Sequence, residues 1–239
     1  MQKVCYNRSM NINSPDFAAL EAEIAQRSAL FERFYQLLIE YNAKFNLTAI
    51  TQKEEVFHKH FLDSVAGAHL LPAGGNIAEV GSGAGFPSIP IRLLRDDLTF
   101  TLVESTGKKC AFLQTAVREL GLEGVNIVNA RAEELGRDPA FRERYDAVIA
   151  RAVAPLASLA EYCMPFVKAG GRFVAWKGSA DELETGRRAL SLLGGGTVLS
   201  VGYELPGGYG ARTLIVAEKK KPTPAQYPRG NGKERKNPL

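Results

Sequence analysis

The sequence predicts a doubly wound α/β fold, in which helices cover both faces of a mostly parallel, seven-stranded sheet. From residue 76 onward, short apolar runs alternate with longer amphipathic segments, as in a parallel sheet with helical crossovers. The first run ends in a glycine-rich turn, Gly81-Ser82-Gly83-Ala84-Gly85. A turn at that place lies at the carboxyl edge of such a sheet, where ligands bind.

Length and composition fit one domain with extensions. The chain has 239 residues, of which 45% are apolar, and it contains no run of ~20 uninterrupted apolar residues that could cross a membrane. Met1–Met10 shows no apolar segment typical of a secretory signal. The three cysteines, Cys5, Cys110 and Cys163, lack C-x-x-C spacing, which favours a reducing, cytoplasmic location without a zinc ribbon.

Three segments are expected: a helical extension packed on the core (1–70), a core domain (71–218) and a basic tail (219–239). The tail carries seven Lys or Arg and one acid, a charge of +6, so the rest of the chain is at −2. Its Pro, Gly and Lys content predicts a flexible segment. Such a tail either aids solubility or contacts a polyanion.

The N-terminal extension begins with helical signals. Ser14-Pro15 predicts a helix start, with Ser14 as the N-cap. Apolar residues then recur at steps of three and four to Tyr41, and the stripe is broken at Arg27, which allows two helices. A further helix is expected to start at Thr51, with Glu54 completing a capping box.

That third helix carries polar residues that are expected to be partly exposed, namely His58, Lys59, His60 and Asp63. A metal site is not expected, because His58 and His60 are two residues apart and point in different directions on a helix.

From residue 76 the elements follow in order, with a closing hairpin whose turn is 206–210. The expected strands are 77–80, 98–103, 125–128, 145–150, 172–176, 197–203 and 212–217. The expected helices are 89–94, 108–120, 132–135, 156–167 and 181–193.

The glycine turn favours S-adenosylmethionine over a dinucleotide. A dinucleotide fingerprint needs its third glycine one place later, where this chain has Phe86. Glu79, two residues before Gly81, gives the pattern acid-x-Gly-x-Gly-x-Gly. A dinucleotide-dependent oxidoreductase is the less favoured alternative.

Other polar residues follow the later strands. Glu104, at the end of the second strand, is placed to accept both ribose hydroxyls. Arg131-Ala132-Glu133 follows the third strand and offers a backbone N–H and a carboxylate to an adenine edge. Arg151 and Lys177 end the fourth and fifth strands and are the candidate catalytic residues. An arginine among apolar residues needs a partner if it is buried, and Glu133 or Asp146 could also supply one.

The sequence lacks the motifs of several other activities. No Asn/Asp-Pro-Pro-aromatic run follows the fourth strand, which disfavours amino-group methylation of adenine or cytosine. Cys163 is followed by Met164 and no Pro-Cys pair is present, so a covalent cytosine mechanism has no nucleophile. P-loop and Gly-x-Ser-x-Gly patterns are also missing.

Taken together, these motifs resemble the bacterial 16S ribosomal RNA guanine-N7 methyltransferases, the glucose-inhibited division protein B family. The resemblance runs from about residue 41 to 217. The segments that carry it are Asn46-Leu47-Thr48, Lys59-His60-Phe61-Leu62-Asp63-Ser64, Val80 to Pro87, Arg151 to Leu156 and Lys177-Gly178. The acids Glu79 and Glu104 depart from the aspartates frequent in that family.

The resemblance implies a Rossmann-like fold, S-adenosylmethionine as the methyl donor, and transfer to a guanine of 16S rRNA, nucleotide 527. With the glycine and strand-end residues above, it gives this expected cofactor set: Gly81, Gly83, Gly85, Phe86, Glu104, Ala132, Glu133 and Arg151. The candidate RNA contacts are Asn46, Lys59, His60, Asp63 and Lys177, besides Arg151 and the tail.

Guanine N7 has a free lone pair and no proton to lose, so direct in-line displacement needs no general base. We expect a monomer that acts on 16S rRNA or the small ribosomal subunit. The alternative is a non-catalytic RNA-binding or nucleotide-sensing module on the same fold.

Overall fold

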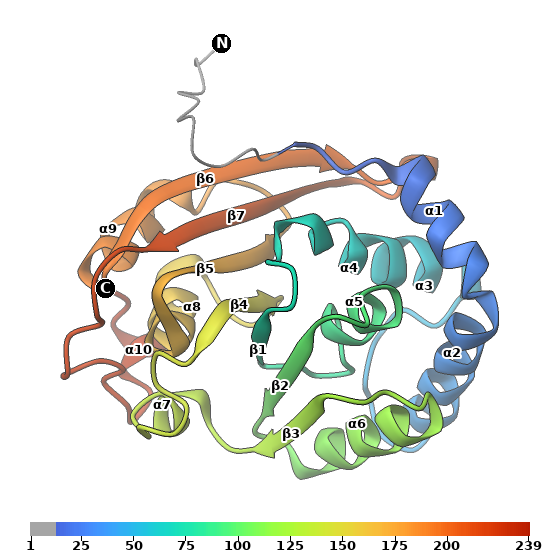
Figure 1. Ribbon diagram of the computed structural model, residues 1–239, viewed down its shortest axis with the longest axis horizontal. Helices are drawn as coiled ribbons and strands as arrows, with labels where there is room; N and C mark the ends of the chain where they lie inside the picture. The colour runs from blue at the N-terminus through green and yellow to red at the C-terminus, as the bar shows by residue number, and fades with distance from the viewer. Residues whose placement is uncertain (1–12) are drawn as a thin grey trace.

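The structure is a computed structural model that describes residues 13–239. Its centre is a sheet of seven strands: β1 (Asn76–Val80), β2 (Thr99–Glu104), β3 (Val125–Asn129), β4 (Tyr145–Arg151), β5 (Val167–Lys177), β6 (Gly195–Glu204) and β7 (Ala211–Lys219). The strand order is β3-β2-β1-β4-β5-β7-β6 (Figure 1). Strands β1 to β5 are parallel, and β7 runs antiparallel to β5 and to β6. The predicted doubly wound sheet is confirmed.

Four helices precede the sheet, five lie between its strands in sequence, and one follows β7 in the described part of the chain. They are α1 (Phe17–Gln26), α2 (Ser28–Asn42), α3 (Lys53–Val56), α4 (Asp63–Val65), α5 (Ser88–Leu94), α6 (Gly107–Glu119), α7 (Ala132–Leu135), α8 (Leu156–Cys163), α9 (Leu183–Leu192) and α10 (Lys233–Lys236). A π-helical segment, η1 (Phe57–Leu62), joins α3 to α4, and 3-10 turns occur at η2 (Ala68–Leu70), η3 (Met164–Phe166) and η4 (Pro206–Gly208).

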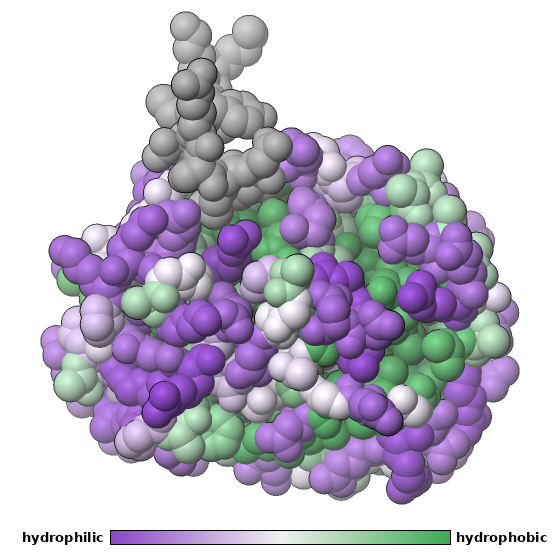
Figure 2. All heavy atoms as spheres, in the orientation of Figure 1, coloured by the Kyte–Doolittle hydropathy of each residue, from purple (hydrophilic) through white to green (hydrophobic). Residues whose placement is uncertain are grey.

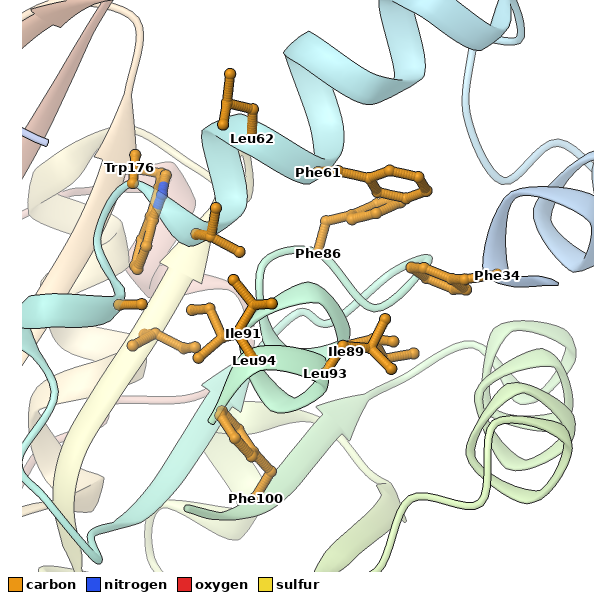
Figure 3. Packing of buried hydrophobic residues seen from close by; sticks show 14 of the residues in the cluster. Phe34, Phe61, Leu62, Phe86, Ile89, Ile91, Leu93, Leu94, Phe100 and Trp176 are labelled. Carbon is orange, nitrogen blue, oxygen red and sulfur yellow. The ribbon is translucent and has the colours of Figure 1, made fainter. Parts of the chain in front are cut away.

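The two faces of the sheet have separate apolar cores, because neighbouring strand residues point to opposite sides. Ile77 packs with the N-terminal helices and with α5 and α6, whereas Ala78 packs with α8 and α9. Figure 3 shows the first core, where the rings of Phe34, Phe61 and Phe86 gather beside α5. The Phe34 ring centroid lies 5.7 Å from that of Phe61 and 5.3 Å from that of Phe86.

The N-terminal extension forms two helices that meet at Arg27, as the broken stripe allowed. The predicted Ser14 cap is wrong. The N-cap is Asp16, whose carboxylate accepts from the Ala19 N–H at 3.1 Å. Ser14 lies two residues too far upstream to reach the free N–H groups of the first turn.

The predicted Thr51–Glu54 capping box is also wrong, because α3 begins at Lys53 and is preceded by Gln52 without a side-chain cap. The helix then widens into the π turn η1. His60 and Asp63, expected to be partly exposed, are buried at 9% and 3% exposure. The reason is a set of distant partners: Arg151 contacts both side chains, the Tyr203 hydroxyl binds the other Asp63 oxygen, and the Thr48 hydroxyl lies beside the second nitrogen of His60.

The tail differs from the flexible segment predicted from its composition. Residues 220–239, here called the C-terminal strap, lie against α8 and the segment after α7, and Glu234 within the strap is fully buried. Its backbone carbonyls accept hydrogen bonds from Arg137 and Arg142. Composition misled the prediction because most contacts of the strap are polar and leave no sequence pattern, although Tyr227 and Leu239 also pack against the apolar core on the α8 side of the sheet.

The remaining elements lie close to their predicted ranges. The main differences are that β5 starts at Val167, five residues early, and that the predicted helix 156–167 ends at Cys163 before η3. On the face shown in Figure 2, hydrophilic residues predominate, and apolar residues show mainly on the side of the N-terminal helices. Within residues 13–239, no helix combines the length and the apolar character needed to span a bilayer.

Candidate active site

The glycine loop between β1 and α5 has a left-handed backbone at Gly81, Gly83 and Gly85, with φ values of +72°, +56° and +83°. Only glycine adopts such values without strain. The loop is attached to β2, because the Gly81 N–H donates to the Val103 carbonyl at 2.8 Å. A Cβ on Gly81 would lie 2.7 Å from a Val153 methyl group, so the loop and the segment after β4 are in close contact.

A cavity of about 390 Å³ lies at the carboxyl ends of β1, β2 and β3. We call it the first cavity. Its lining residues are Val80, Gly81, Gly83, Val103, Glu104, Ser105, Thr106, Lys109, Ala130, Arg131, Ala132, Glu133, Ala152, Val153, Tyr162 and Arg235.

The Glu104 carboxylate is fixed at the wall of the first cavity. One oxygen accepts from the Gly83 N–H at 3.0 Å, and the other accepts from the Thr106 N–H at 2.7 Å. Glu104 therefore connects the glycine loop to β2 and has acceptor lone pairs left for a ligand.

The predicted cofactor residues divide into three groups. Those that line the first cavity are Gly81, Gly83, Glu104, Ala132 and Glu133. Gly85 and Phe86 lie outside the lining of this cavity. Arg151 lies in the lining of a neighbouring cavity.

Gly85 and Phe86 face away from the first cavity and pack against neighbouring elements. A Cβ on Gly85 would lie 2.4 Å from Ile89, so helix α5 packs directly on the loop. The Phe86 ring stacks on His60, with ring centroids 4.5 Å apart, and the Arg151 guanidinium lies 5.1 Å from the ring centroid. Phe86 thus joins the glycine loop to the second group of polar residues.

A second cavity, of about 460 Å³, adjoins the first. Its lining residues are Ile50, Lys59, His60, Asp63, Arg151, Ala152, Trp176, Lys177, Gly178, Ser179, Glu182 and Arg212. The structure thus brings together the predicted residues Lys59, His60, Asp63, Arg151 and Lys177. Asn46 is exposed and lies outside both linings.

Arg151 is held by the N-terminal extension. Its guanidinium donates to the Asp63 carboxylate at 3.0 Å and to the Lys59 carbonyl at 3.1 Å. The other Asp63 oxygen accepts from the Tyr203 hydroxyl at 2.8 Å. Burial and the Asp63 charge raise the pKa of Tyr203 far above its usual range, so the hydroxyl remains a donor.

Lys177 is anchored beside Arg151. Its ammonium pairs with Glu182 at 2.7 Å and donates to the Ala154 carbonyl at 3.1 Å. The alternatives considered for Arg151, pairing with Glu133 or Asp146, are not what the structure shows, since Asp63 is the partner.

His60 is a neutral imidazole at physiological pH. Burial, and next the Arg151 charge, lower the pKa of His60 to about 3. Its Nε2 lies 2.9 Å from the Thr48 hydroxyl, and its Nδ1 lies 3.2 Å from an Arg151 nitrogen. The ring therefore serves as a fixed, uncharged connection.

Glu79 is fully buried under the glycine loop. Burial raises the pKa of Glu79 to about 8, against the opposing effect of a hydrogen bond from Ser88. Its second oxygen has no partner among the described residues. At neutral pH the side chain is mainly protonated, which avoids the cost of an uncompensated buried charge.

The two cavities share Ala152, the residue after β4. Its φ is +54°, a left-handed value that is strained for any residue with a Cβ. Strained backbone of this kind concentrates at functional sites. A ligand in the first cavity and a ligand in the second would therefore both lie next to Ala152.

Some lining residues were missed by the sequence interpretation, among them Thr106, Lys109, Tyr162 and Arg235 of the first cavity and Arg212 of the second. Thr106 follows Glu104 closely and could have been found from its place at a strand end. Arg235 gave no signal, because nothing in the sequence indicates that the tail returns to the sheet.

The sheet order, the glycine loop after β1 and the carboxylate at the end of β2 define a Rossmann-like methyltransferase fold. Solved structures agree. A SAM-dependent O-methyltransferase from Thermotoga maritima matches with a TM-score of 0.54 and 17% identity, over 77% of this chain and 72% of that one. Pyrococcus horikoshii TYW2, in complex with MeSAdo, matches with a TM-score of 0.55 and 14% identity, over 68% and 63%.

The chain belongs to the family of rRNA small subunit methyltransferase G, which matches residues 27–201. It is 46% identical over 215 residues to ribosomal RNA small subunit methyltransferase G of Lactobacillus delbrueckii subsp. bulgaricus, covering 87% of this chain and 90% of that one. The protein of the same name from Exiguobacterium sp. is 42% identical over 232 residues, covering 95% and 96%.

This membership confirms the resemblance and decides against the dinucleotide-dependent oxidoreductase.

No group of three or more His, Cys, Asp or Glu able to hold a metal occurs in the described part of the chain.

Proposed function

We propose that this chain transfers a methyl group from S-adenosylmethionine to N7 of a guanine in 16S ribosomal RNA. The observation that carries the proposal is the pair of cavities that meet at Ala152, one with the features of a donor site and the other lined by basic side chains. The family membership supports the same reaction.

The first cavity fits the donor. Its volume is within the range of small-molecule sites. Glu104 is oriented to accept hydrogen bonds from ribose hydroxyls, and Ala132 with Glu133 offers an N–H and a carboxylate to the adenine edge. The left-handed Gly83 lets the backbone approach the ligand closely. When bound, the donor supplies a methyl group on a positively charged sulfur.

The second cavity fits the nucleic-acid acceptor. Four cationic side chains line it, Lys59, Arg151, Lys177 and Arg212, against two acids, Asp63 and Glu182. A net positive lining attracts phosphate and makes binding dependent on salt. Proteins that recognise RNA take bases that are splayed out of the helix, and a base held here would lie beside Ala152.

The reaction requires positioning more than proton transfer. Guanine N7 presents a lone pair, so His60 can remain neutral throughout. Asp63 and Lys59 hold Arg151 in one place at the second cavity. Holding two reactants in line can supply up to ~7–11 kcal/mol of the barrier, and we assign the rate enhancement to this effect.

The test is transfer of a labelled methyl group. The protein is incubated with labelled S-adenosylmethionine and small ribosomal subunits from a strain that lacks its gene, and the RNA is digested for mass mapping. We expect one 7-methylguanosine in 16S rRNA, at nucleotide 527 if the family resemblance extends to the target. Donor binding without any transfer would instead indicate a non-catalytic RNA-binding module.

Naked 16S rRNA and assembly intermediates, assayed in parallel, identify the preferred form of the substrate. The monomeric state stays a prediction. The cytoplasmic location rests on the cysteine pattern, and the individual site residues rest on the resemblance and on the cavity linings.

A further inference from the structure

The C-terminal strap is tied to the fold by arginines that precede it in the chain. Arg142 donates to the carbonyls of Thr223 at 2.7 Å and Tyr227 at 2.8 Å. Arg137 donates to the carbonyl of Pro228 at 2.8 Å. Both arginines lie between α7 and β4, so the strap is fixed to the segment that follows Ala132 and Glu133.

A second anchor joins the strap to α8. The Arg229 guanidinium pairs with the fully buried Glu161 carboxylate at 2.7 Å, and the Arg229 N–H donates to the same carboxylate at 2.8 Å. The Ser158 hydroxyl donates to the Glu234 carbonyl at 2.7 Å. The Glu234 carboxylate is buried and accepts from the Gly230 N–H.

These two sets of contacts fix the position of Arg235, the residue after Glu234. Because Glu234 points inward, its neighbour Arg235 lies at the wall of the first cavity, with Tyr162 and Glu133 in the same lining. The Glu161 carboxylate is occupied by Arg229, and one Glu234 oxygen accepts from the Gly230 N–H while the other lies buried without a partner among the described residues. The Arg235 guanidinium is therefore placed at the cavity by a buried framework and keeps its donors for a ligand.

We propose that Arg235 is a donor-binding residue that contacts the adenosine end of the donor, and that the strap forms one wall of the donor site. This inference rests on the function proposed above. The adenosine end follows from the neighbours of Arg235, since Ala132 and Glu133 line the part of the cavity that fits adenine. A guanidinium is planar and always charged, so it both stacks on aromatic rings and donates hydrogen bonds.

The inference is tested by calorimetric titration of S-adenosylhomocysteine into the full-length protein and three variants: Arg235→Ala, Arg235→Lys and Lys236→Ala. Lys236 is the matched control, because it neighbours Arg235, is exposed and is not in the lining of the first cavity. The ligand has no net charge near pH 7, so loss of one distant positive charge has little effect by itself.

We expect Arg235→Ala to raise the dissociation constant about three- to tenfold, as for one partly exposed cation–π or charge-assisted contact. Arg235→Lys should lie between Arg235→Ala and the unaltered protein, and Lys236→Ala should stay within about twofold. Titration of methylthioadenosine, which lacks the amino-acid end, should show the same relative loss for Arg235→Ala.

Equal dissociation constants for Arg235→Ala and Lys236→Ala would overturn the assignment of Arg235. A loss seen with S-adenosylhomocysteine but not with methylthioadenosine would place Arg235 at the amino-acid end and overturn the adenosine contact. Failure of the unaltered protein to bind S-adenosylmethionine would refute the proposed function itself, which is a separate result.

Discussion

The Arg151 guanidinium donates to the Asp63 carboxylate at 3.0 Å, although the two residues are 88 positions apart in the sequence. The pair joins the end of β4 to the start of α4 in the N-terminal extension. Tyr203 of β6 binds the other carboxylate oxygen, so one buried acid connects three segments. The extension is thus part of the second cavity as well as of the apolar core.

Asp63→Ala should lower the free energy of unfolding by about 3–5 kcal/mol, because it leaves the largely buried Arg151 without its ion partner. Urea denaturation measures the loss. The exposed pair Arg33–Glu119 provides the control, and Glu119→Ala should cost less than about 1 kcal/mol. Similar losses of unfolding free energy for the two variants would show that the buried Asp63–Arg151 pair contributes no more to stability than an exposed ion pair.

Gly83→Val should abolish detectable donor binding, because it introduces a side chain at a left-handed position in the wall of the first cavity. Gly74→Val is the matched control. Gly74 has a similar φ of +63° and open space around its Cβ, but it lies outside the cavity. Both variants carry comparable backbone strain, so calorimetry should separate them. Retained affinity in Gly83→Val would remove the glycine loop from the donor site.

Glu104→Ala should weaken donor binding by about 1.5–3 kcal/mol, the value for a lost hydrogen bond to a charged group. Glu104→Gln keeps one acceptor oxygen and should lose less. Both dissociation constants can be measured by calorimetry with S-adenosylhomocysteine. An unchanged constant in Glu104→Ala would mean that the carboxylate only orders the loop through Gly83 and Thr106.

Glu79 should make the protein less stable as the pH rises. Its pKa of about 8 in the folded state lies above the usual 4.5. Between these values the folded chain keeps a proton that the unfolded chain has released, so the free energy of unfolding falls with increasing pH. Glu79→Gln cannot titrate and should therefore gain stability over the unaltered protein from about pH 5 to pH 8.

Urea denaturation at three pH values within that window tests this expectation. Glu184→Gln, at an exposed side chain, should leave the pH profile unchanged. Parallel profiles for Glu79→Gln and the unaltered protein would contradict a protonated Glu79.

Arg229→Ala should destabilise the protein by about 3–5 kcal/mol, since Glu161 is fully buried and would lose its charge partner. The released strap should also become sensitive to trypsin at Lys233, which mass spectrometry of the fragments can detect. Arg187→Ala removes an exposed ion pair on α9 instead and should change neither property. A strap that stays protected in Arg229→Ala would show that other contacts hold it.

The sheet could be predicted from sequence because its strands are apolar runs separated by clear helix and turn signals. The glycine loop and Glu104 could be placed because strand ends of a parallel sheet meet at one edge. Burial of His60 and Asp63 could not be foreseen, since it depends on Arg151 at a distance along the chain. The same holds for the C-terminal strap, which is stabilised by arginine contacts to backbone carbonyls, and these leave no periodic pattern.

The strap follows all seven strands in the sequence and adds none of its own to the sheet. A chain cut shortly after β7 would therefore keep every strand, but it would leave the buried Glu161 carboxylate without Arg229 and would remove Arg235 from the wall of the first cavity.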